Sequence, residues 1–387
     1  MQMDPIVVAS AARTPMGAFQ GELKSHSATE LGAAAIRAAV GRAGLGDTEV
    51  SEVVMGCVLP AGLGQAPARQ AALGAGLSDA IPCATLNKVC GSGMKAVMLG
   101  FDMIAAGSAD VVVAGGMESM SNAPYLLDKA RAGQRLGHGR VLDHMFLDGL
   151  EDAYDRGRLM GAFAEETARH YQFTRDDQDA YALESLTRAK RAAETGAFDD
   201  EIVPVEAGVR SDEGPRKARP EKIPTLKPAF RADGTVTAAN ASSISDGAAA
   251  LVLMRMSEAE RRGHAPLAIV RGHASHAAAP AWFSTAPIGA IGKLAGKVGW
   301  SMDAVDLFEI NEAFAVVAMA AMRDLDLPRD KVNVHGGACA LGHPIGASGA
   351  RIIVTLAAAL ARTGGRRGIA SLCIGGGEAT ALAVERI

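Results

Sequence analysis

The sequence of 387 residues is poor in features that mark several common protein classes. Aromatic residues make up 4% of it, the formal net charge is −4, and there is no long run of lysine or arginine. Proteins that bind nucleic acids usually carry basic patches and aromatic side chains that stack on bases, so we expect no nucleic acid partner. Among the longest apolar stretches is IIVTLAAALA at 352–361. It is shorter than the ~18 residues of a membrane span, so we expect no membrane partner.

Cysteine is also scarce. The five cysteines are odd in number and widely spaced, and they form no CxxC pair: Cys57, Cys83, Cys90, Cys339 and Cys373. A disulfide framework usually has an even number of cysteines in a short chain, and zinc sites usually contain CxxC-type pairs, so we expect neither of them. The short apolar segment near the start lacks the basic residues that open a signal peptide. We therefore expect a reducing, cytoplasmic location.

Apolar segments of two kinds alternate along the chain. Residues 50–59, 109–116, 306–314 and 367–377 have the composition of buried strands, whereas the alanine-rich segments 28–44, 313–325 and 348–364 are typical of helices. Strands that alternate with helices predict an α/β architecture.

Two distant segments share one layout. In 90–116 and 345–376, Ser-Gly opens a helix, glycine closes it, and an apolar strand follows that ends in Gly-Gly. This predicts two similar halves, although βα units in general look alike. Residues 119–241 differ from both halves and suggest an inserted loop domain. Its segment 210–231 has seven basic and three acidic residues. That segment is either a solvated loop or a site for phosphate groups.

Cys90 is the first candidate for chemistry. It follows an apolar stretch and precedes Gly-Ser-Gly in LNKVCGSGMKAV, residues 86–97. A cysteine at the start of a helix is expected to have thiolate character, because the helix dipole and free N–H groups favour the charged form. A buried structural thiol is the alternative.

Three further residues lie at predicted strand ends or helix starts. His343 precedes a proline in a glycine-rich loop, Cys373 ends a strand before Gly375, and Asn311 begins NEAFA. In α/β proteins, sites form at such positions, so these groups are expected to meet.

Six segments together resemble the thiolase family over essentially the whole chain. In order they are NKVCGSGMKAV, AGGMESMSNAPY, GTVTAANASSISDGAAAL, NEAFA, GGACALGHPIGASGAR and CIGGG. The resemblance implies a duplicated five-layer α/β/α/β/α fold with an inserted loop domain. Residues 1–118 with 242–266 would form the first half, 119–241 the loop domain and 267–387 the second half.

Within that family the sequence is most similar to acetyl-CoA acetyltransferases. The resemblance implies that Cys90 is the acylated nucleophile, Cys373 the acid/base thiol and His343 the group that activates Cys90. Asn311 would hold a water in one oxyanion hole with His343, and the N–H groups of Cys90 and Gly375 would form a second. The implied contacts to coenzyme A are Met160, Arg216, Phe230, Ala238, Ser242 and Phe314.

The implied reaction joins two acetyl-CoA molecules into acetoacetyl-CoA and coenzyme A, and also runs in reverse. A thioester exchanges readily with a thiol, which suits cysteine as acyl carrier, and the enolate of the second substrate needs hydrogen-bond donors. The resemblance implies no cofactor, because coenzyme A thioesters are substrates, and it implies a homotetramer built from two dimers.

Four other functions are alternatives to this one. A thiolase for longer 3-ketoacyl chains is the nearest alternative, and the others are a fatty-acid condensing enzyme, a scaffold with a degenerate site and a redox protein. The Cys373 motif argues against a condensing enzyme, and the four retained groups argue against a scaffold. Four departures from the family pattern are expected near the pocket wall and leave chain length open: Leu159, His335, Glu378-Ala379 and STAPIGA at 284–290.

Overall fold

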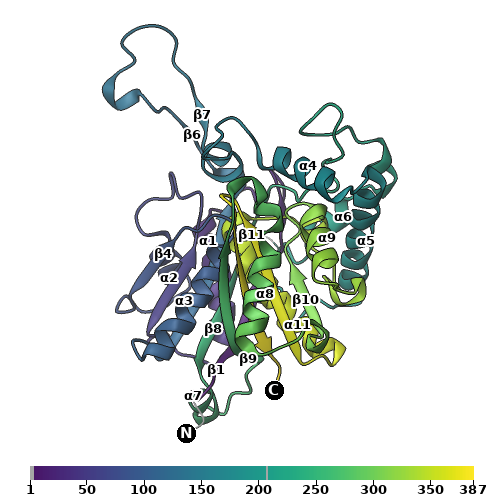
Figure 1. Ribbon diagram of the computed structural model, residues 1–387. Coiled ribbons are helices and arrows are strands. Elements are labelled where there is room, and N and C mark those ends of the chain that lie inside the picture. Colours follow the sequence, from purple (N-terminus) through teal and green to yellow (C-terminus); the bar gives the residue numbers. More distant parts are fainter. Residues whose placement is uncertain (1–3, 206–207) are drawn as a thin grey trace.

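The computed structural model describes residues 4–205 and 208–387. Residues 1–3 of the predicted first half and 206–207 of the predicted loop domain lie outside the described residues. Most described strands belong to one sheet with the order β10-β11-β12-β9-β1-β8-β5-β3-β4, and β2 pairs with β8 at its side (Figure 1). The sheet is mixed, because β3 runs parallel to β4 and β5, whereas β8 runs antiparallel to β1 and β5.

The strands that make up this sheet are β1 (Ile6–Arg13), β2 (Gly17–Ala18), β3 (Glu52–Gly56), β4 (Cys83–Leu86), β5 (Val111–Ser119), β8 (Ser245–Arg255), β9 (Ala268–Ala277), β10 (Leu307–Ile310), β11 (Arg367–Ile374) and β12 (Glu378–Glu385). The helices that pack on it or lie in the connections between its strands are α1 (Ala28–Arg42), α2 (Pro67–Gly74), α3 (Ser92–Ala106), α7 (Met256–Arg261), α8 (Ala286–Val298), α9 (Ala315–Asp324), α10 (Ala338–Leu341) and α11 (Ile345–Thr363). Two antiparallel strands, β6 (Tyr125–Leu126) and β7 (Leu142–Asp143), form a separate hairpin.

The central strands are buried on both faces, as their continuous apolar runs predict. In β5, Val111 and Val113 pack against α1 and α2, whereas Val112 packs on the opposite face against α3 and α11. In β11, Leu372 also faces the α3–α11 layer, while Ile369 faces α8 and α9. Helix α11 contacts β5 and β8 of one half and β10 and β11 of the other. The result is the five-layer α/β/α/β/α arrangement that the resemblance implies.

The helices of the central layer are long and apolar. The windows Val89–Ala106 and Ile345–Thr363 satisfy the length and composition of a membrane span, but 83% of the second window is buried inside the protein. Its apolar character is thus explained by packing between the two halves of the sheet. Helix α11 begins at Ile345 rather than at Ser348, because Pro344 takes the N-cap position. Ser348 therefore lies in the first turn.

The segment between the halves carries α4 (Met160–Tyr171), α5 (Arg175–Glu194) and α6 (Glu213–Lys217), which gather beside α9 (Figure 1). Tyr181 and Ser185 on α5 donate hydrogen bonds of 2.9 and 2.8 Å to the buried carboxylate of Glu312, next to the predicted site residue Asn311. This segment is therefore anchored directly beside the predicted site. The domain boundaries themselves stay a prediction.

The crossing of α3 and α11 predicts a strong effect of a single methyl group. A Cβ at Gly349 would lie 2.4 Å from the Met94 nitrogen, a backbone atom that cannot move alone. We expect Gly349→Ala to lower the free energy of unfolding by ~2 kcal/mol or more, because overpacking outweighs the better helix propensity of alanine.

Gly292 on α8 is the matched control, since it is exposed and a Cβ there would meet nothing within 4 Å. Gly292→Ala is expected to raise the free energy of unfolding by ~0.5–1 kcal/mol. Urea unfolding at one protein concentration measures both variants. Equal effects of the two substitutions would contradict the close helix crossing.

Candidate active site

A cavity of about 370 Å³ opens where β11, the start of α3 and the start of α11 meet the loop segment. Its volume and mainly apolar lining are typical of small-molecule sites. The predicted site residues that line it are Cys90, Met160, Phe230, Ala238, Ser242, Phe314, His343, Cys373 and Gly375. Residues from both halves and from the loop segment therefore contribute to one site.

Cys90 follows a strained turn. The preceding Val89 has φ of 46°, a left-handed conformation that costs a β-branched residue of order 1–3 kcal/mol. Two side chains stabilise the turn. Asn87 accepts a 2.8 Å hydrogen bond from the Val89 N–H, and the Ser92 hydroxyl accepts one of 2.8 Å from the Lys88 N–H. Strain held in place this way is common at functional sites.

The Cys90 thiol is not the resting thiolate that the sequence suggested. Burial raises its pKa to about 11, and the backbone N–H groups of Gly375 and of Cys90 itself only partly oppose this. Loss of water around the sulfur therefore outweighs the helix start. Cys90 must lose its proton to a neighbouring base when it reacts.

Cys373 lies on β11 and is 1% exposed. Burial raises its pKa well above the ordinary value, and the neighbouring Cys90 adds to this shift. Because each thiolate disfavours the other, the pair holds at most one negative charge readily. Gly375, two residues on, is the residue whose N–H faces the Cys90 sulfur.

His343 follows a turn that only glycine fits. Gly342 has φ of 104°, and a Cβ on it would lie 2.1 Å from the Ser245 hydroxyl oxygen. The His343 N–H donates a 3.0 Å hydrogen bond to the Ser243 carbonyl. Burial lowers the pKa of the His343 ring to about 3, and the charge of Arg351 adds to this effect. The imidazole is therefore neutral at physiological pH, and one of its ring nitrogens has a free lone pair.

Asn311 does not line the cavity but lies directly behind it. It is 1% exposed, its N–H donates a 3.0 Å hydrogen bond to the Ser371 carbonyl, and its amide nitrogen lies 3.5 Å from His343 Nδ1. Its amide oxygen is buried without a partner among the described residues. An unpartnered buried oxygen of this kind is a natural place for a water.

Arg216 is not brought to the cavity. It is exposed on α6, where its guanidinium pairs with the Glu22 carboxylate at 2.6 Å. The charge of Arg216 therefore lies at the surface. Its role in binding coenzyme A stays a prediction. The aromatic contacts fit better, since Phe230 and Phe314 line the cavity with ring centroids 6.0 Å apart.

Of the four departures from the family pattern, only Leu159 lines the cavity. The other three do not line it. His335 packs against Phe198, and Glu378 pairs with Lys88. The STAPIGA segment runs from the loop into α8, although Phe283 just before it does line the cavity.

Sequence reasoning missed two polar residues beside the site. Ser348 lies with its hydroxyl 2.5 Å from His343 Nδ1. Glu118 is fully buried and accepts hydrogen bonds from the N–H groups of Val58, Leu59 and Gly346. Both belong to quoted motifs, but only the fold reveals which groups they contact.

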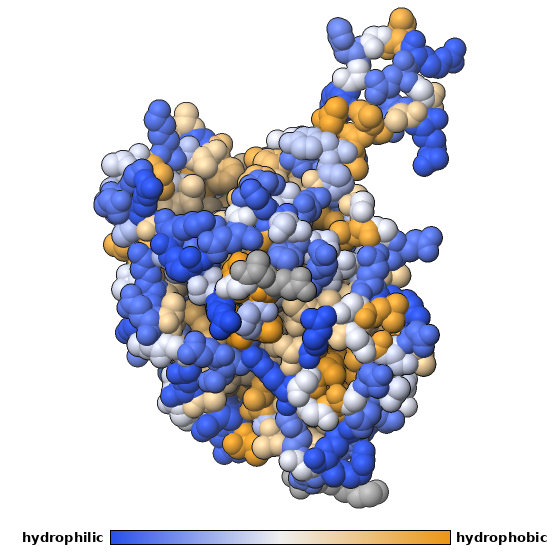
Figure 2. Space-filling model, turned by 180° about the vertical axis from the view of Figure 1, so that it is seen from behind, coloured by the Kyte–Doolittle hydropathy of each residue, from blue (hydrophilic) through white to orange (hydrophobic). Residues whose placement is uncertain are grey.

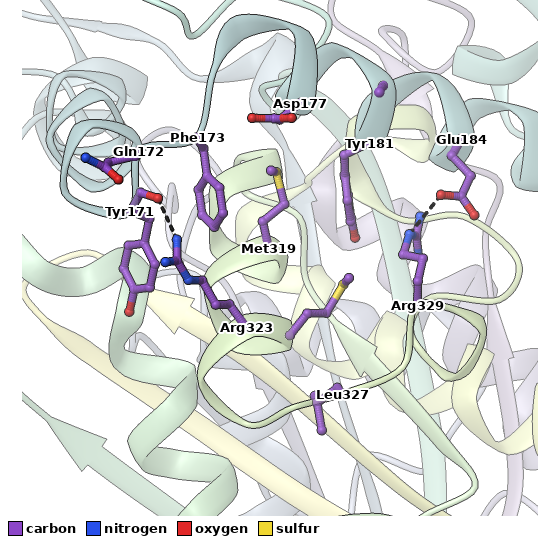
Figure 3. Close-up of a pocket in the computed structure, with 12 residues that line it drawn as sticks. Tyr171, Gln172, Phe173, Asp177, Tyr181, Glu184, Met319, Arg323, Leu327 and Arg329 are labelled. Atoms are coloured by element: carbon purple, nitrogen blue, oxygen red, sulfur yellow. Dashed lines mark hydrogen bonds and ion pairs between the residues drawn. The ribbon is translucent and has the colours of Figure 1, made fainter.

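A second hollow lies away from this chemistry, between α5 and the end of α9 (Figure 3). Arg323 and Arg329 reach into it, yet both are occupied, because Arg323 donates to the Tyr171 carbonyl at 2.6 Å and Arg329 to Glu184 at 3.1 Å. It holds no thiol or imidazole. Within residues 4–205 and 208–387, no group of three His, Cys, Asp or Glu side chains is placed to hold a metal.

The raised pKa of Cys90 predicts how the rate of its alkylation depends on pH. We expect alkylation of Cys90 by iodoacetamide to accelerate about tenfold per pH unit until the pH approaches the pKa of about 11, since only the thiolate is nucleophilic. Mass spectrometry identifies the modified cysteine, and the buried Cys57 is the internal control. A rate that levels off near an unperturbed pKa of ~8.5 would contradict the assignment.

Comparison with known proteins agrees with the fold. Residues 6–257 match the family model of the thiolase N-terminal domain, and residues 264–386 match that of the thiolase C-terminal domain. The chain is 51% identical to acetyl-CoA acetyltransferase 2 of Arabidopsis thaliana, over 98% of this chain and 96% of that protein. It is 48% identical to acetyl-CoA acetyltransferase of Pseudomonas aeruginosa, over 99% of this chain and the whole of that protein.

A solved structure shows the same fold. It is a thiolase from Ascaris suum in complex with coenzyme A, 42% identical, with a TM-score of 0.95 over 99% of this chain and the whole of that one. The two family models together span nearly the entire sequence. The chain therefore belongs to the thiolase family.

Proposed function

We propose that this protein is an acetyl-CoA C-acetyltransferase, which condenses two acetyl-CoA molecules to acetoacetyl-CoA and coenzyme A and catalyses the reverse thiolysis. The observation that carries the proposal is one cavity lined by two thiols and a neutral imidazole, Cys90, Cys373 and His343. The full-length relatives named acetyl-CoA acetyltransferase favour this over a thiolase for longer acyl chains.

In the first half-reaction, the base is His343 and the nucleophile is Cys90. His343 Nε2 takes the Cys90 proton as the sulfur attacks the thioester carbonyl of acetyl-CoA. The N–H groups of Cys90 and Gly375 stabilise the oxyanion. When the carbon–sulfur bond to coenzyme A breaks, the departing sulfur takes the proton of Cys373. The protein is then acetylated on Cys90, with a thiolate at Cys373 and an imidazolium at His343.

This proton distribution prepares the second half-reaction. The Cys373 thiolate removes a proton from the methyl group of a second acetyl-CoA, and the His343 Nε2–H donates to the enolate oxygen, together with a water held by Asn311. The enolate attacks the acetyl group on Cys90 and forms the carbon–carbon bond. The Cys90 sulfur then leaves and recovers its proton from His343, so the resting state is restored.

The raised pKa of both thiols supports this order of steps. Two neighbouring thiolates repel each other, so Cys373 holds a charge best when Cys90 carries an acyl group. Acetylation of Cys90 therefore stabilises the base that the next step needs. The scheme uses no cofactor and no metal, because the thioester already activates its carbonyl and its methyl group.

The remaining expectations are part of the proposal. Coenzyme A would contact Met160, Ala238, Ser242, Phe230 and Phe314 at the cavity, with Arg216 nearer the surface. The protein would be cytoplasmic.

The proposed homotetramer would join two dimers through the loop segment, where the β6–β7 hairpin projects from the body (Figures 1 and 2). Leu136 is 98% exposed on this hairpin, and Tyr125 and Val141 are also largely exposed. Apolar side chains gathered on a projection are typical of a surface that another subunit covers.

Two cysteine variants test the division of roles. Cys90→Ala should form no acyl-enzyme with acetyl-CoA. Cys373→Ser should still acylate Cys90, because coenzyme A can leave as a thiolate, but should lose condensation by roughly 10²-fold or more. Intact-protein mass spectrometry measures the acyl-enzyme, and acetoacetyl-CoA formation measures condensation.

Cys83→Ala is the control, because Cys83 is half-buried on β4 and does not line the cavity. Its two rates should equal those of the unmodified protein. Condensation at the normal rate in Cys373→Ser would remove Cys373 as the base.

The preferred acyl-chain length can be tested by comparing kcat/KM for a short and a longer substrate. We expect acetoacetyl-CoA to be cleaved with a kcat/KM at least about tenfold above that of 3-ketohexanoyl-CoA, because a longer chain must displace cavity wall. If the cavity had room, two extra methylenes would favour the longer substrate by up to ~1.6 kcal/mol. A higher kcat/KM for 3-ketohexanoyl-CoA would favour the thiolase for longer chains.

A further inference from the structure

We infer that Ser348 is a positioning residue that holds the His343 ring with its hydrogen on Nδ1, so that Nε2 keeps its lone pair for the cavity. The inference deepens the proposed function, since it rests on His343 as the base for Cys90. Ser348 lies in the first turn of α11 and is 1% exposed, so water does not compete for its hydroxyl.

The hydrogen bonds of this hydroxyl fix its direction. Ser348 Oγ lies 2.5 Å from His343 Nδ1 and donates to the Pro344 carbonyl at 2.9 Å. Bonding from a serine to the carbonyl four residues earlier is a common geometry in helices. A hydroxyl has one hydrogen. When that hydrogen is directed to the Pro344 carbonyl, the oxygen accepts from the ring, and Nδ1 carries the hydrogen.

The surroundings of the ring point the same way. His343 Nε2 is buried and has no protein partner among the described residues, although it belongs to a residue that lines the cavity with Cys90. The competing neighbour is the amide nitrogen of Asn311, which would favour a lone pair on Nδ1. It lies at 3.5 Å, against 2.5 Å for Ser348, and hydrogen bonds weaken steeply over that range.

One consequence is that the ring serves both half-reactions without turning. Nε2 first accepts the Cys90 proton, and the same Nε2–H then donates to the enolate oxygen. Throughout, Nδ1–H stays bonded to Ser348, so the imidazolium that forms between the two steps already has one N–H satisfied. Without this acceptor, the charged ring would leave a buried donor unpaired, which is costly.

The tautomer can be measured directly in the free protein. In a long-range ¹H–¹⁵N spectrum of the full chain at neutral pH, the His343 ring should show a protonated Nδ1 and an unprotonated Nε2. The spectrum of a His343→Asn variant identifies the signals among those of the nine histidines. A hydrogen on Nε2 in the unmodified protein would overturn the inference, and this measurement needs no Ser348 variant to fold.

The second arm compares Ser348→Ala with Ser10→Ala. Ser10 is also buried and donates to a helix carbonyl, that of Ala39 at 2.6 Å, instead of bonding to a histidine ring. In Ser348→Ala, Asn311 becomes the remaining neighbour of Nδ1, so the Nε2–H form should appear. Acylation of Cys90 by acetyl-CoA should fall about tenfold to hundredfold. Ser10→Ala should change neither the spectrum nor the rate.

The outcomes separate the two proposals. An unchanged tautomer and an unchanged acylation rate in Ser348→Ala would overturn the role of Ser348. If the spectra behave as expected but the unmodified protein forms no acyl-enzyme, the proposed function fails while the tautomer assignment stands.

Discussion

The close crossing of α3 and α11 is the constraint on which the rest of the structure depends. Cys90 lies just before α3 and His343 just before α11, so the separation of these helices sets the separation of nucleophile and base. The helices approach so closely only because glycines face each other's backbones. A Cβ at Gly93 would lie 2.8 Å from the Ala350 nitrogen, and one at Gly349 would lie 2.4 Å from the Met94 nitrogen. Packing and chemistry are thus set by the same residues.

The loop segment is attached to this centre by buried charge rather than by apolar packing alone. Arg13 of β1 is fully buried and pairs with Glu201 at 2.6 Å and with Asp212 at 2.7 Å, which frame the segment before α6. Removing one member of such a group would leave an unpaired buried charge, whose cost is several kcal/mol. These ion pairs tie the loop segment to β1.

Most of the fold could be predicted from the sequence, because the central strands are buried on both faces and their apolar runs are therefore continuous. It also located Cys90, His343 and Cys373, since each lies beside glycine at a strand end or helix start. It erred where tertiary surroundings decide. The charge state of Cys90 depends on its burial, which raises its pKa, and helix position alone suggested the opposite direction. The pairing of Arg216 with Glu22, which is 194 residues away, could not be predicted from the sequence either, and the role of Arg216 stays a prediction.

Exclusion of water from the site favours the uncharged form of each of its titratable groups. Burial raises the pKa of Cys90 and Cys373 and lowers that of His343, so every group is held in its neutral form at rest. Because these side chains are neutral, the anionic thioester can bind without a charged side chain beside its reacting carbon. Charge then appears only as protons move, and it appears where donors already point, at Gly375 and at the ring of His343. A site organised in this way needs little rearrangement during the reaction, because its dipoles are oriented before the charge develops.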